Sequence, residues 1–187
     1  MWNILRIFIV YSRTGHISGM ESECDGESIY RSDYVLFDRG NRFMGLVEEV
    51  RKKNKLLAMI IRNNYECEGV DFITPNEYSQ QVAYMHHPTG KVIDAHVHNM
   101  VHRNVVLTQE VLFIKKGILR VDFYDEYEDY LESRDLHAGD IILLVSGGHG
   151  FRVLDEVEMV EVKQGPYAGD QDKKRFAGIE EERIRYV

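Results

Sequence analysis

His96 and His98 form the sequence His-Val-His inside an otherwise apolar stretch of the chain. Residues two positions apart on a β-strand project from the same face, so a strand here would place both imidazoles side by side. Imidazole nitrogen is a common ligand of divalent metals, at metal–nitrogen distances of roughly 2.0–2.1 Å for zinc. The spacing therefore predicts that the two histidines bind a single cation.

Glu110 follows a polar loop over residues 99–107 and opens the next predicted strand. Thr108, Leu112 and Ile114 share its face under strand alternation, so one carboxylate lies among mainly apolar neighbours. A buried carboxylate requires a cation or a hydrogen-bond partner, because burying an unpaired charge is costly. A metal ion shared with His96 and His98 would meet that requirement.

These residues together resemble the first motif of the cupin superfamily. Gly90 is followed after five residues by His96-Val97-His98, and Glu110 is followed after six residues by Gly117. Eleven residues separate His98 from Glu110, more than in the family pattern, which predicts a longer loop between the two strands.

The phrase LHAGDIILLVSGGHG resembles the second cupin motif. Gly139 and Gly147 stand at the family positions, whereas Val145 replaces the family's proline and His149 comes one residue early. His149 is therefore expected to be the third imidazole.

The resemblance covers residues 56–165 and implies a double-stranded β-helix, or jelly-roll, barrel with a divalent transition metal (Mn, Fe, Ni or Zn). The implied metal ligands are His96, His98, Glu110 and His149. Two further stretches, TQEVLFIKKG and EVKQGPYAGDQDKKRF, are similar to small single-domain cupins often encoded among bacterial surface-polysaccharide genes. For those proteins the resemblance implies metal binding and a sugar-related role.

The predicted function is a metal-binding cupin that acts on a sugar or another small oxygenated metabolite, as an isomerase, epimerase or oxygenase. One alternative is a metal-free sugar-nucleotide isomerase or epimerase that uses a pocket histidine as its base. Another is a cupin that binds a small ligand without catalysis. Bound metal separates the first possibility from the second, and the catalytic residues are left open.

Hydrophobic spacing predicts the elements that position these residues. Phe43, Leu46, Val47 and Val50 follow the spacing of one helix face, which predicts a helix over about 41–53. Short β candidates then recur without βαβ alternation, as in a sandwich or barrel. They cover residues 56–62, 70–74, 80–87, 140–145 and 157–163, together with a hairpin turning at Lys116-Gly117.

The 187-residue chain has 31 acidic and 23 basic residues, a formal net charge of -8. This balance disfavours nucleic acid and anionic membrane as partners, since binding phosphate requires clustered Lys and Arg. Cys24 and Cys67 show no metal-type or disulfide pattern, which favours a cytoplasmic location. The apolar residues Val111 and Phe113 face away from Glu110, so the N-terminal segment or a second subunit must cover that face, and we predict a homodimer.

The N-terminal residues 1–39 show no sustained periodicity, so the expected organisation is a poorly constrained segment followed by a cupin domain over 40–187. The apolar opening MWNILRIFIVY contains Arg6 and is too short to span a bilayer. Met20 is an alternative start, which would leave residues 1–19 outside the native protein.

Overall fold

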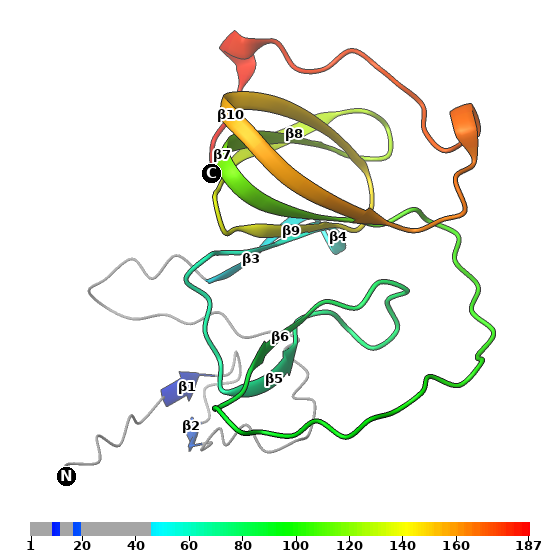
Figure 1. The fold of residues 1–187 in the computed structure, drawn as a ribbon. Coiled ribbons are helices and arrows are strands. Elements are labelled where there is room, and N and C mark those ends of the chain that lie inside the picture. The colour runs from blue at the N-terminus through cyan, green and yellow to red at the C-terminus, as the bar shows by residue number, and fades with distance from the viewer. Residues whose placement is uncertain (1–8, 12–16, 20–45) are drawn as a thin grey trace. The chain divides into compact units, whose positions relative to one another are not determined.

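The computed structural model describes residues 9–11, 17–19 and 46–187, and strands dominate this part of the chain (Figure 1). The chain divides into two units, Met1–Gly45 with Glu66–His98 and Leu46–Tyr65 with Asn99–Val187. Each unit is described by itself. The predicted all-β class is confirmed for the described residues, whose helical content is two short 3-10 turns, η1 (Gly169–Gln171) and η2 (Glu181–Arg183).

In the first unit, two strand pairs are antiparallel. The pairs are β1 (Ile9–Tyr11) with β2 (Ile17–Gly19), and β5 (Gly69–Phe72) with β6 (Ala83–His86). The hydroxyl of Thr74 accepts the Val82 N–H at 2.9 Å and so closes the β5–β6 connection. A turn follows β6 at Pro88-Thr89-Gly90, where the Lys91 N–H donates to the Pro88 carbonyl at 3.2 Å.

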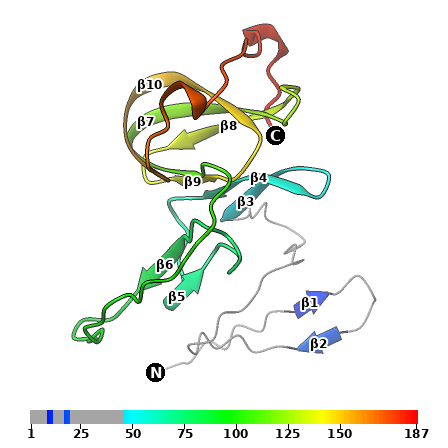
Figure 2. The ribbon, with the colours of Figure 1, turned by 90° about the vertical axis from the view of Figure 1, so that its right-hand side faces the viewer.

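The second unit is one antiparallel six-stranded sheet that curls into a half-barrel (Figures 1 and 2). The strand order is β10-β7-β9-β4-β3, and β8 pairs with β7. The strands are β3 (Val47–Lys52), β4 (Lys55–Ile61), β7 (Glu110–Tyr124), β8 (Tyr130–His137), β9 (Ile141–Leu144) and β10 (Gly148–Lys163). β7 pairs with β10 along its whole length, and on its other side with β9 and then β8.

The core lies on the inner face of this sheet. β4 and β9 are continuous apolar runs, as expected for central strands covered on both faces. The core cluster comprises Val50, Leu57, Ala58, Ile60, Leu112, Ile114, Leu119, Val121, Phe123, Leu136, Ile142 and Leu144.

The hairpin predicted at Lys116-Gly117 is wrong, because β7 runs through both residues. Gly117 has φ 81°, and an irregularity in the β7–β10 ladder lies opposite it. One extra residue in a strand changes which alternate side chains face the core. Even-numbered Leu112 and Ile114 are buried before Gly117, and odd-numbered residues such as Leu119 are buried after it. The glycine therefore bends the strand instead of reversing it.

The helix predicted over about 41–53 is also wrong where the structure describes it. Residues 41–45 lie outside the described residues, and Val47–Lys52 is strand β3. β3 is joined to β4 by a two-residue turn in which Lys53 has φ 55°. Val50 is buried in the core, and pairing with the strongly apolar β4 outweighs the helical spacing of four residues. No helix among the described residues is long and apolar enough to cross a membrane.

Candidate functional site

Glu110 and His149 meet on the inner side of the curled sheet, with Oε2 and Nε2 3.2 Å apart. Glu110 is the first residue of β7, and His149 lies opposite Phe123, near the other end of that strand. The curl of β7 and β10 therefore brings together two residues from opposite ends of one strand ladder (Figure 1).

The faces of the two strands explain the direction of both side chains. Glu110 alternates with the core residues Leu112 and Ile114, so it shares their face. His149 shares a face with its ladder partner Phe123, which also belongs to the core. The side chains of Glu110 and His149 are 12% and 29% exposed, so the pair is shielded but still reached by solvent.

The pKa of the Glu110 carboxyl is lowered, first by the hydrogen bond with His149. Burial opposes this shift, and the charges of His149, Lys163 and Lys173 add to it. Glu110 is therefore an anion at neutral pH and accepts a hydrogen bond from the imidazole N–H. A carboxylate that holds an imidazole in this way fixes its tautomer and orientation, as in acid–base and metal sites.

Lys163 and Phe151 complete the surroundings, and neither is among the site residues predicted from the sequence. Lys163 is the direct ladder partner of Glu110, and the Phe151 ring centroid lies 5.1 Å from that of His149. Pairing VEMVEVK with TQEVLFIKKG in register would have placed Lys163 beside Glu110. That register depends on the bulge at Gly117, which carries no unambiguous local signal.

His96 and His98 lie close to each other in the first unit, with ring centroids 5.3 Å apart. The strand predicted around them is not formed, because no strand occurs between β6 and β7. Both residues are exposed. His96 Nδ1 lies 2.9 Å from the Asp94 carbonyl oxygen, a contact that requires the proton on Nδ1 and leaves the Nε2 lone pair for a ligand.

The four predicted ligands therefore lie as two pairs, one in each unit. Within the part of the chain that the structure describes, no three His, Cys, Asp or Glu side chains gather in a way that could hold a metal ion.

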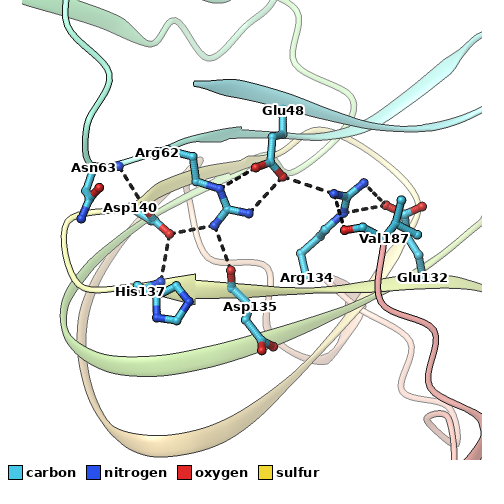
Figure 3. Close-up of polar contacts among 9 residues, drawn as sticks. All are labelled: Glu48, Arg62, Asn63, Glu132, Arg134, Asp135, His137, Asp140 and Val187. Atoms are coloured by element: carbon cyan, nitrogen blue, oxygen red, sulfur yellow. Dashed lines mark hydrogen bonds and ion pairs between the residues drawn. The ribbon is translucent and has the colours of Figure 1, made fainter. Parts of the chain in front are cut away.

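A second polar cluster in the sheet unit, here called the Arg62 network, consists of Glu48, Arg62, Arg134 and Asp140 (Figure 3). Arg62 donates to both Glu48 oxygens at 2.7 and 3.0 Å, to Asp140 Oδ2 at 2.9 Å and to the Asp135 carbonyl at 2.9 Å. Arg134 donates to Glu48 Oε2 at 3.3 Å.

Asp140 is the most buried member of the network, at 2% exposure. Besides Arg62, it accepts the backbone N–H groups of Asn63 and His137, each at 2.9 Å. Arg62 and Asp140 flank the paired ends of β4 and β9, where Ile61 lies opposite Ile141. The network therefore locks strand ends together and leaves little capacity for a ligand.

Comparisons with known proteins give no relative: no family model, curated protein or solved structure matches this chain.

Proposed function

We propose that this chain is a metal-binding protein of the cupin type, with a jelly-roll barrel, that binds a sugar or another small oxygenated metabolite. His96, His98, Glu110 and His149 are the proposed ligands of one divalent transition metal ion, Mn, Fe, Ni or Zn. The observation that carries the proposal is the convergence of Glu110 Oε2 and His149 Nε2, 3.2 Å apart, on the inner side of the curl.

The separation of these two atoms fits a shared ion. Ligand atoms each about 2.1 Å from an ion and at right angles to one another are about 3.0 Å apart. The observed 3.2 Å is close to that value. Imidazole with carboxylate suits borderline divalent metals and does not select among them.

The tautomer of His96 also supports a ligand role. Histidines that bind metals usually donate the second ring N–H to a carbonyl or carboxylate, which orients the ring. The contact from His96 Nδ1 to the Asp94 carbonyl is of this kind. When bound, the ion would act as a Lewis acid that polarises a ligand oxygen or lowers the pKa of water.

A second candidate function is favoured by the hydrogen bond between Glu110 and His149 itself. A carboxylate that orients an imidazole is the arrangement of a general base, which could remove a proton next to a carbonyl without metal. This candidate corresponds to a metal-free sugar-nucleotide isomerase or epimerase. A cupin that binds its ligand without catalysis would need neither a Lewis-acid metal nor a general base.

Metal analysis of the purified protein tests the proposal. We expect close to one divalent ion per chain, and loss of most of it in His96→Ala, His98→Ala, His149→Ala and Glu110→Gln. His137→Ala is the matched control, because this exposed histidine belongs to β8 and lies outside the proposed ligand set. Wild-type protein that stays metal-free after dialysis against Mn, Fe, Ni and Zn would rule out the metal and leave the general base.

The homodimer also belongs to this proposal. Val111 is buried within the chain, whereas Phe113 is exposed, so only part of the predicted apolar face needs a cover. β10 ends the strand order of the sheet and exposes Met159, Val160 and Val162. Exposed apolar residues along an edge strand favour pairing with another chain. Light scattering should give the mass of two chains, and a monomeric mass at micromolar concentration would contradict it.

A further inference from the structure

Lys163 is placed to act on whatever the Glu110–His149 pair binds. It is the last residue of β10 and lies directly opposite Glu110 in the antiparallel ladder. Directly opposed residues project from the same face of a sheet. The Lys163 side chain is 26% exposed, so it is largely covered without being sealed off from solvent.

The acidic groups near Lys163 hold it only loosely. Its Nζ lies 3.6 Å from Asp172 Oδ2 and 3.8 Å from Glu161 Oε1, both longer than a charged hydrogen bond of about 2.7–2.9 Å. The other oxygen of Asp172 accepts the Thr108 hydroxyl at 3.1 Å. An ammonium has three donors, so these two ion pairs leave it able to take a closer anionic oxygen.

One aromatic ring lies beside Lys163 and another lies beside His149. The Tyr167 ring centroid lies 5.7 Å from Lys163 Nζ, and its side chain is 75% exposed. Phe151 is partly exposed beside His149. Exposed rings next to hydrogen-bonding groups suit the flat apolar face and hydroxyl groups of a small ring-shaped ligand.

We infer that Lys163 binds the carboxylate or phosphate group of a small acidic ligand, whose remaining atoms occupy the Glu110–His149 pair. The substrate class is then an acidic sugar, such as a uronic acid or a sugar phosphate, instead of a neutral sugar. The inference rests on the proposed function in one respect, that Glu110 and His149 form the ligand site.

Calorimetric binding of three probes with one ring framework tests this assignment. Glucose is neutral, glucuronate adds a carboxylate, and glucose 6-phosphate adds a phosphate. We expect the better acidic probe to bind at least ten-fold more tightly than glucose, and the tighter of the two acids identifies the anionic group. Lys163→Gln should bring this ratio close to one, and Lys163→Arg should keep most of it.

Lys115→Gln is the control, because this exposed lysine of β7 has only a loose, solvent-exposed pairing with Glu158, at 3.8 Å. It should leave the ratio unchanged. The inference is overturned if wild-type protein binds none of the probes, if it does not prefer an acidic probe, or if Lys163→Gln keeps the preference.

Metal content, measured on the same samples, separates this inference from the proposed function. If the protein is metal-free and still prefers an acidic probe, the anion site is supported and the proposed metal site is contradicted. If the protein carries metal but shows no such preference, only the anion site is contradicted.

Discussion

The sheet unit contains two clusters of opposite charges that differ in how completely their polar atoms are satisfied. In the Arg62 network, Asp140 receives three donors and Arg62 contacts two carboxylates and a carbonyl. In the Glu110–His149 pair, a single contact of 3.2 Å joins two partly exposed side chains.

This difference separates the cluster that stabilises the fold from the one that is available to a ligand. Buried polar groups contribute to a unique structure when all their hydrogen bonds are made. A pair that keeps lone pairs and exposure has capacity for a further partner, whether an ion, a proton or a substrate oxygen. The comparison predicts a large stability effect at Asp140 and a small one at Glu110 or His149.

Asp140→Ala should have the largest effect of all the substitutions considered. It leaves the Arg62 guanidinium short of one carboxylate and orphans the N–H groups of Asn63 and His137. We expect a loss of about 3–5 kcal/mol, as for other broken buried ion pairs. At roughly 2–4 °C per kcal/mol for a chain of this size, the melting temperature should fall by about 10 °C.

Glu110→Gln and His149→Ala, measured in metal-free protein by the same thermal melt, should each cost less than about 1 kcal/mol. Glu158→Gln provides the baseline, because its side chain is 61% exposed. A large loss of stability at Glu110 or His149 would erase the distinction between the two clusters.

Gly117→Ala should have the next largest effect, and it tests whether the bend in β7 is needed to bring Glu110 to His149. Alanine at φ 81° is strained, and its Cβ would overlap the Glu156 carbonyl. We expect a loss of about 2–4 kcal/mol by urea denaturation, from the strain and the clash together. In the folded fraction, metal or ligand binding should weaken as well.

Gly169→Ala is the matched control for backbone strain, because Gly169 also has positive φ (67°) but no atom within 4 Å of the added Cβ. It should cost about 1 kcal/mol. Equal losses at the two glycines would mean that the close approach to Glu156 is unimportant.

The sequence predicted the strands that have strong local signals. LLAMIIR and DIILLV are short apolar runs, and they form β4 and β9. Two strand-like runs that meet at Lys116-Gly117 predict a hairpin, but a reversal and a bulge produce the same local pattern. Four apolar residues at helical spacing predict a helix where β3 forms, because the strand state of this segment depends on its pairing with β4.

The candidate site was only partly predictable for the same reason. Glu110 and His149 were found through spacing that resembles a family motif, and the structure brings them together. The placing of Lys163 depends on register with β7 across a bulge, which local sequence does not determine. The pairing of Arg62 with Asp140 is predictable from the sequence, because Arg62 directly follows the apolar run of β4 and Asp140 directly precedes that of β9. These two runs pair antiparallel, which places the opposite charges at the same end.

Asp135 combines a backbone carbonyl that is hydrogen-bonded with a carboxylate that is not fully satisfied. Its replacement should have the smallest effect on stability. Its carbonyl accepts a hydrogen bond from Arg62, but its carboxylate Oδ1 is buried without a hydrogen-bond partner. Burial raises the pKa of this carboxyl, against the attraction of His137, Arg120 and Arg62. Above the ordinary pKa of an aspartate and up to the raised value, the folded chain binds more protons than the unfolded chain. The free energy of unfolding therefore falls as pH rises through that window and stays lower above it.

Asp135→Asn removes the charge and should stabilise the protein at pH 7 by up to about 1 kcal/mol, the scale of one hydrogen-bonding group. The gain should shrink as pH falls through the raised pKa toward the ordinary aspartate value, because the wild-type carboxyl of the folded chain is then protonated and no longer buries a charge. Urea denaturation at pH 7 and pH 4 measures both values, and the exposed Asp129→Asn on the same hairpin controls for the lost net charge. A destabilised Asp135→Asn at pH 7 would mean that attraction to the neighbouring cations outweighs burial. Asp135 would then belong with the fully satisfied residues of the Arg62 network.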